Sequence, residues 1–177
     1  MKDGKQIIMT DKTPVNSDKV TDPGRPRAFY SILYGGLVVG VLDFLDAIIF
    51  FGLRGSTPRG IFQYVASGLL GRAAFSGGTK TFVLGLLLHF LNAFIFATIY
   101  YFASLWLPTL IRRPFLWGPL YGVVVHLVMT FVVTPMSAAP VGKYPVPVML
   151  NGVIGHALLV GLPIALIARW SARANRP

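Results

Sequence analysis

The sequence predicts an all-α integral membrane protein: a four-helix bundle of transmembrane spans, with an additional amphipathic outer-surface helix between spans one and two. Two observations predict this class. Of the 177 residues, 54% are hydrophobic and 12% are charged, whereas about a quarter of a soluble domain is charged. After residue 28 the only acidic residues are Asp43 and Asp46, and both lie inside an apolar run. Such a composition is typical of a chain that spans a bilayer several times.

The elements follow one another in a simple order. Residues 1–28 form a polar tail without enough apolar residues for a core. A transmembrane bundle at 29–168 follows, with spans at about 29–53, 81–107, 115–135 and 147–168, and residues 169–177 form a basic tail. Each span has the ~20 residues that a hydrocarbon layer of ~30 Å requires. Pro114, Pro135 and Pro147 bracket the third and fourth spans, where a missing backbone N–H does least harm.

A further helix is expected at about 58–76, in the loop between the first two spans. Thr57 is placed to cap its start, Pro58 suits its first position, and the Gly77-Gly78 pair is placed to end it. Its expected apolar face consists of Ile61, Phe62, Val65, Leu69 and Ala73, with Arg59, Gln63 and Ser67 off that face. This pattern predicts a helix lying on the outer surface, and a shallow re-entrant helix is the alternative.

The lysines and arginines predict the orientation in the membrane. The N-terminal tail has six, the 108–114 loop has two and the C-terminus has three, whereas five lie in the other two loops. The positive-inside rule then places both termini in the cytoplasm. Although the net charge is +10, the basic residues gather at the ends of apolar segments. Contact with the lipid bilayer is therefore the prediction, and no nucleic acid is expected as a partner.

Ionisable residues from all four spans share one depth. The members of this polar layer are Asp43, Asp46, His89, His126 and His156, with Asn92 one helical turn after His89. Counted back from the outer ends of their spans, the five ionisable residues lie roughly 12–17 Å below the outer boundary at about 1.5 Å per residue. Because a charge at this depth costs roughly 2.5–3.5 kcal/mol on insertion scales, such residues face the bundle interior and pair.

Four interpretations of this layer stay open. The histidines can be structural, hydrogen-bonded across helices to fasten the bundle. His89 and His156, with His126 nearby, can instead bind a cofactor as axial ligands of a haem or chlorophyll-type pigment, for which Gly85 and Gly152 would leave room. A metal centre would use the three histidines and one aspartate, which is the intramembrane metalloprotein alternative. A proton or ion path would run through both aspartates and the histidines.

Small residues predict where helices come close together. Gly36-x-x-x-Gly40 in the first span and Gly118-x-x-x-Gly122 in the third are small-x-x-x-small faces. They serve packing inside the bundle or contact with another subunit, so the expected partners are other membrane subunits or a homo-oligomer.

One stretch resembles a known kind of protein. It runs from Phe62-Gln63 through Gly71 to Gly78, is followed by His89-Phe90, and is completed by Pro135-Met-Ser137, His156 and Gly161-Leu-Pro163. Over about residues 30–168 the pattern resembles a group of small multi-span bacterial inner-membrane proteins to which no reaction is assigned. The resemblance implies a helical bundle in the bacterial inner (cytoplasmic) membrane, and it implies no cofactor or catalytic residue.

The leading functional prediction is a non-catalytic accessory subunit of a larger membrane complex, an energy-transducing one included, whose buried layer fastens helices or ligates a cofactor. The alternatives are a small transporter or proton-conducting protein and an intramembrane metalloprotein. The sequence has no nucleophile elbow, phosphate-binding loop or dinucleotide fingerprint, and it favours no enzymatic activity. With no cysteine in the chain, thiolate metal ligands and disulfides are excluded.

Overall fold

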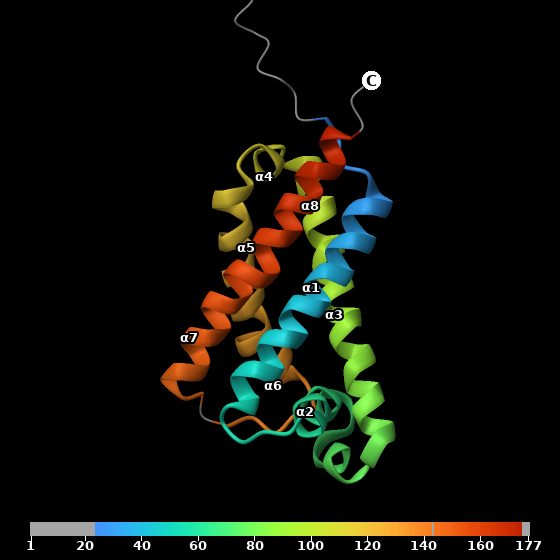
Figure 1. Cartoon of the computed structure of the whole chain (residues 1–177), viewed down its shortest axis with the longest axis vertical. Helices are drawn as coiled ribbons and strands as arrows, with labels where there is room; N and C mark the ends of the chain where they lie inside the picture. Colours follow the sequence, from blue (N-terminus) through green and yellow to red (C-terminus); the bar gives the residue numbers. More distant parts are fainter. Residues whose placement is uncertain (1–23, 143, 175–177) are drawn as a thin grey trace, which may run out of the picture.

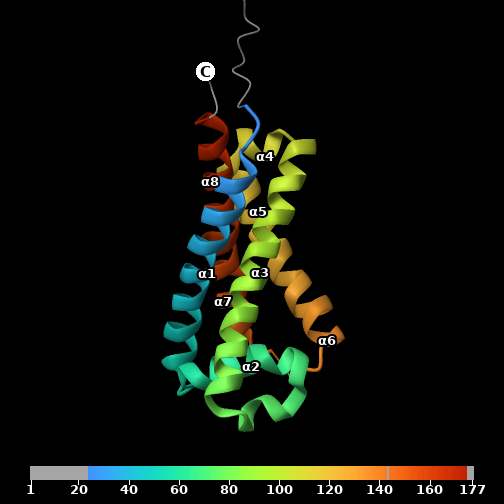
Figure 2. The same ribbon diagram turned by 90° about the vertical axis from the view of Figure 1, so that its right-hand side faces the viewer.

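Four long helices run along the length of the molecule, and a short helix lies across one end of them (Figures 1 and 2). The computed structural model describes residues 24–142 and 144–174. The short crossing helix is α2 (Pro58–Leu70), and α4 (Thr109–Arg112) lies at the opposite end with both described chain ends. These two ends of the bundle are called the α2 end and the α4 end below.

The four long helices are membrane spans by length and hydropathy. They are α1 (Ala28–Gly52), α3 (Gly78–Trp106), a third span over Pro114–Met136 and a fourth over Val146–Arg173. Their 25, 29, 23 and 28 residues all exceed the ~20 needed to cross the hydrocarbon layer. Large apolar side chains such as Leu87, Ile49 and Phe131 point outward, where lipid would surround them. The predicted all-α, four-span membrane bundle is confirmed.

The third and fourth spans each contain one π-helical turn. The third consists of α5 (Pro114–Val128), a π-turn at Met129–Val133 and α6 (Thr134–Met136). The fourth consists of α7 (Val146–Gly155), a π-turn at His156–Gly161 and α8 (Leu162–Arg173). A proline, Pro135 or Pro163, stands two residues after each π-turn. Proline lacks the N–H that would close the preceding α-turn and its ring crowds the carbonyl four residues back, which explains the wider turn.

Glycines allow the spans to approach closely. Gly36 and Gly40 of α1 face the rings of Phe94 and Phe90 of α3, which fill the space where a side chain would be. In the second pair, Gly118 and Gly122 of α5 lie against the backbone of the fourth span, and a Cβ at Gly122 would collide with the carbonyl of His156. The two small-x-x-x-small faces thus lie at contacts between helices of the same chain.

Helix α2 is held against the bundle by a face that the sequence analysis did not identify. Its start is as expected, with Pro58 in the first turn and the Thr57 hydroxyl accepting a hydrogen bond from the Gly60 N–H at 3.1 Å. A 3₁₀ turn at Gly71–Ser76 completes the loop. The buried residues are Phe62, Gln63, Ala66 and Ser67, whereas Leu69 is exposed.

The expected division of α2 into apolar and polar faces was therefore wrong at Gln63, Ser67 and Leu69. Gln63 is buried because its amide donates hydrogen bonds to the Gly78 carbonyl at 3.1 Å and the Thr81 hydroxyl at 3.2 Å, both at the start of α3. Ser67 donates to the carbonyl of Tyr64 at 2.6 Å. A buried polar group that finds such partners costs little, so polarity alone did not indicate which side of α2 faces the bundle.

The half of the bundle toward α4 is closely packed. Val39, Ala97, Val125 and Val160, from four different spans, are each 1–3% exposed and belong to one apolar core. Tyr100 is fully buried there and donates its hydroxyl proton to the carbonyl of Leu110 at 3.0 Å. This half therefore forms a dry plug beneath the polar layer.

The two predicted tails differ in how much of them the structure describes. The N-terminal tail, predicted at 1–28, lies outside the described residues up to residue 23. In the C-terminal tail, predicted at 169–177, the helix continues through Arg173. Ala168 and Ala172 are buried, and the Ser171 hydroxyl lies 2.8 Å from that of Ser31 in α1. These contacts extend the fourth span beyond its apolar stretch.

Candidate functional site

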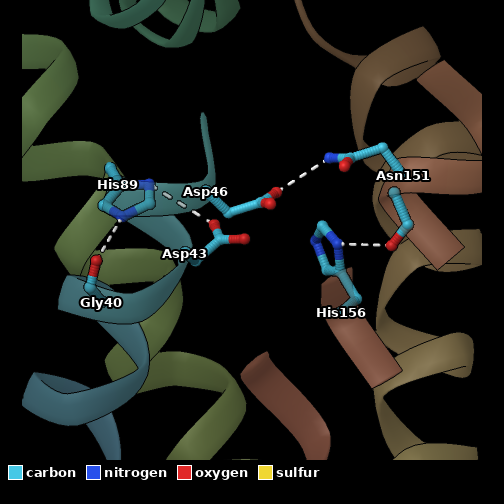
Figure 3. A network of polar contacts seen from close by, with 7 residues as sticks. Gly40, Asp43, Asp46, His89, Asn151 and His156 are labelled. Atoms are coloured by element: carbon cyan, nitrogen blue, oxygen red, sulfur yellow. Dashed lines mark hydrogen bonds and ion pairs between the residues drawn. The ribbon is translucent and has the colours of Figure 1, made fainter. Parts of the chain in front are cut away.

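Asp43 and His89 face each other in the middle of the bundle (Figure 3). His89 lies on α3, and its Nε2 is 2.9 Å from the carbonyl oxygen of Gly40 on α1. Since a carbonyl only accepts hydrogen bonds, Nε2 carries the proton and donates it. The other ring nitrogen, Nδ1, lies 3.9 Å from the Asp43 carboxylate. Both side chains are largely shielded, with 11% and 27% of their surfaces exposed.

Nδ1 is the ring nitrogen that faces the carboxylate, because Nε2 donates its proton to the Gly40 carbonyl. At 3.9 Å the two groups are beyond hydrogen-bond distance, and they form an ion pair only when His89 carries a second proton. Asp43 and His89 are called the candidate one-proton site below.

Asp46 forms a hydrogen bond with a residue outside the predicted polar layer. Its carboxylate accepts a hydrogen bond from the side-chain amide of Asn151 in α7 at 2.9 Å, as Figure 3 shows. Gly155 provides the space, since a Cβ there would lie 3.2 Å from the carboxylate oxygen. The pair joins the first and fourth spans. Asn151 was not among the candidate residues, although a single asparagine five residues before His156 in an apolar span was a usable signal.

His126 and His156 form a second pair of rings. Their centroids lie 5.1 Å apart and their planes are inclined by 57°. The Nδ1 of His156 donates to the Gly152 carbonyl at 2.9 Å, which leaves its Nε2 as an acceptor. His126 is only 7% exposed, and its Nε2 has no partner among the described residues. A buried imidazole nitrogen without a partner is a group to which a polar ligand would bind.

Four of the predicted polar residues line one cavity of about 170 Å³. They are Asp43, His89, Asn92 and His156. The cavity has room for several waters, because one water takes roughly 30 Å³. Met129, His156 and Val160 on its wall belong to the two π-turns. Asp46 and His126 lie beside this cavity and do not line it. The structure thus brings four of the six predicted residues to one hollow and places two around it.

Two further cavities lie between this hollow and the α2 end. One, of about 250 Å³, shares the wall residues Val65, Asn92 and Met129 with the hollow. The other, of about 540 Å³ at the α2 end, shares only Tyr64 with the second. The apolar plug described above lies on the α4 side of the hollow.

The residues present do not fit a haem or a chlorophyll-type pigment. The room expected beside Gly85 is filled by the backbone of Phe62 in α2, and that beside Gly152 is filled by the His126 ring. The lined cavity of about 170 Å³ is also smaller than the roughly 300–1,000 Å³ of ordinary ligand pockets. His89, His126 and His156 therefore do not form a macrocycle site.

The metal centre likewise receives no support. Across residues 24–142 and 144–174, no three His, Asp or Glu side chains are grouped so that they would hold a metal ion. His89 is turned toward Gly40 and His156 toward Gly152, so their ring nitrogens are not directed at one common point.

Comparisons of the chain with known protein families, with curated proteins and with solved structures find no match. No family is identified, and the resemblance to small bacterial inner-membrane proteins stays a prediction. The helices themselves show a multi-span membrane protein in contact with the lipid bilayer.

Proposed function

We propose that this protein is a small proton carrier of the membrane in which Asp43 and His89 bind the proton. The observation that carries this proposal is the cavity lined by Asp43, His89, Asn92 and His156. Ionisable residues that line a hollow in a helix bundle are typical of proton relays and transport sites. The Asp43 carboxylate faces Nδ1 of His89 at 3.9 Å, and the two groups attract each other once His89 carries a second proton.

Access from one side supports a carrier more than an open channel. Two cavities lie between the pair and the α2 end. On the other side, Val39, Ala97, Val125 and Val160 are closely packed. A carrier exposes its site to one side at a time, and its site lies where helices are interrupted. The π-turns beginning at Met129 and His156 interrupt two spans beside the cavity, and π-turns are frequent at functional sites.

The proposal includes an orientation. Arg112, Arg113, Arg169 and Arg173 belong to the α4 end, whereas Arg54, Arg59, Arg72 and Lys80 belong to the α2 end. Together with the six basic residues of the N-terminal tail, the positive-inside rule places the α4 end and both termini in the cytoplasm of a bacterial inner membrane. The protons would then enter from the outside.

The accessory-subunit hypothesis stays a prediction, as does a homo-oligomer, because the structure describes a single chain. A subunit role is compatible with the same candidate one-proton site. The two differ in one respect: a carrier moves protons by itself in a membrane that contains no other protein.

Proton uptake into liposomes tests the proposal. The purified protein is reconstituted into vesicles loaded with the pH dye pyranine, and a potassium diffusion potential drives protons inward. Wild-type protein should acidify the interior faster than protein-free vesicles, and Asp43→Asn or His89→Gln should lower the rate by roughly tenfold or more. Thr98→Val is the matched control, since Thr98 bonds only to Phe94 within α3. The proposal is contradicted if the wild-type protein acidifies the vesicles no faster than empty vesicles. It is also contradicted if both variants retain the wild-type rate.

A further inference from the structure

The largest of the three cavities lies at the α2 end, away from the candidate one-proton site. It measures about 540 Å³ and lies between the start of α2 and the segment that leads into α7. This volume falls within the roughly 300–1,000 Å³ typical of small-molecule sites. Four aromatic rings, from Phe51, Tyr64, Phe75 and Tyr144, line it. The cavity is therefore large enough for a ligand and has flat apolar walls.

The wall of this cavity contains a buried hydroxyl group, that of Tyr144. Nearby, burial raises the pKa of the Tyr64 phenol above its ordinary value, with smaller contributions from the proximity of Tyr144 and from a hydrogen bond that Tyr64 donates to the Tyr144 oxygen. The proton of the Tyr144 hydroxyl itself is left without an acceptor among the described residues. A buried phenol proton without an acceptor costs free energy, and an acceptor atom placed in the cavity would remove that cost.

The residues that line the cavity also indicate whether it suits a charged or a neutral ligand. Among the described residues that line the cavity, none carries a charge, and the polar ones contribute hydroxyl groups. These described side chains therefore offer no countercharge to an ionised ligand, which would lose part of its hydration on binding. Aromatic side chains favour flat, apolar partners through stacked and edge-to-face contacts.

From these observations we infer that the α2-end cavity is a binding site for a neutral, largely apolar, ring-containing small molecule whose hydrogen-bond acceptor pairs with the Tyr144 hydroxyl. The site is separate from Asp43 and His89, since the 250 Å³ cavity lies between them and only Tyr64 is shared. The inference does not require the protein to transport protons.

Photo-cross-linking with benzophenone tests this site directly. Benzophenone is neutral, has two aromatic rings and one carbonyl acceptor, and forms covalent bonds to nearby C–H groups when irradiated. With the full chain in lipid nanodiscs, mass spectrometry should locate saturable cross-links at cavity residues such as Phe51, Phe75 and Val148. Cross-links distributed evenly over lipid-facing residues such as Leu87 would show simple partition into lipid and overturn the inference.

Two variants test the binding contacts. Tyr144→Phe removes one hydroxyl whose proton has no acceptor among the described residues, so the protein should remain folded. It should raise the half-saturating benzophenone concentration roughly three- to tenfold, as expected for one hydrogen bond. Gly142→Trp fills the cavity from a position with open space around its Cβ and should abolish the cavity cross-links while leaving those at lipid-facing residues.

Competition with a pair of unreactive analogues makes the result independent of folding. Fluorenone keeps the carbonyl acceptor, whereas diphenylmethane has two rings and no acceptor. Fluorenone should compete better in the wild type, and the two should compete equally in Tyr144→Phe. Equal competition in the wild type, or an unchanged preference in the variant, would rule out the pairing with Tyr144.

Discussion

The imidazole of His126 in the third span occupies the space beside Gly152 in the fourth, where any other residue would place its Cβ. His126 is thereby held against His156, with ring centroids 5.1 Å apart. The absence of one side chain thus positions a buried histidine next to the polar cavity. The contact explains a glycine that the sequence analysis had associated with room for a macrocycle.

Gly152→Ala should therefore destabilise the protein. The added methyl group collides with the His126 ring, and such overpacking costs about 1–3 kcal/mol. Unfolding in detergent by increasing amounts of dodecyl sulfate, followed by circular dichroism, measures the change. Gly52→Ala is the control, because nothing lies within 4 Å of its Cβ position. The double variant Gly152→Ala with His126→Ala lacks the colliding ring and should recover part of the lost stability. Equal stability of the wild type, Gly152→Ala, Gly52→Ala and the double variant would refute the contact.

The hydrogen bond between Asp46 and Asn151 should stabilise the protein, and exchanging the two residues with each other should preserve most of this stability. Asn151→Leu removes the amide donor at 2.9 Å and leaves the carboxylate without it, which should cost about 1–3 kcal/mol. The exchanged double variant, Asp46→Asn with Asn151→Asp, retains an amide and a carboxylate in contact and should recover most of that loss. The same unfolding assay applies. An exchanged variant as unstable as Asn151→Leu would show that the pair is not the source of the effect.

Access to the cavity can be tested by cysteine labelling, since the natural chain has no cysteine. Asn92→Cys places a thiol at the wall shared by two cavities. A membrane-impermeant methanethiosulfonate should modify it when added to the α2 side and not when added to the α4 side, because a thiol must meet water to ionise and react.

Two further thiols serve as controls for this labelling. Ala97→Cys lies in the apolar plug at 1% exposure, and Leu87→Cys lies on the outer, lipid-facing surface. Neither should react from either side. Modification of Asn92→Cys from the α4 side, or of Ala97→Cys from any side, is incompatible with a site that is closed toward α4.

The architecture was predictable because it depends on length and composition. An apolar stretch long enough to cross a bilayer has to form a helix there, and this requirement located four spans. Counting residues also predicted a common level for Asp43, His89 and His156, since the rise per residue in a helix is nearly constant. These three residues and Asn92 line one cavity in the structure.

Rotation about the helix axes and the partners of individual residues were not predictable in the same way. Depth does not reveal that Asp46 turns toward Asn151 while Asp43 turns toward His89. A glycine shows only that something comes close: at Gly85 it is the backbone of Phe62, and not a cofactor. On α2, Gln63 is buried because the next helix provides acceptors for its amide, which no pattern within α2 encodes.

The most direct test of the central claim is a nitrogen NMR spectrum of the protein in lipid with ¹⁵N-labelled histidine, with His89 assigned by its loss in His89→Gln. The account predicts that Nε2 of His89 carries a proton in the wild type and in Asp43→Asn, because it donates a hydrogen bond to the Gly40 carbonyl. It also predicts that the protonation of Nδ1 changes when Asp43 is replaced by asparagine. An unprotonated Nε2, together with an Nδ1 signal that Asp43→Asn leaves unchanged, would contradict a shared proton between Asp43 and His89.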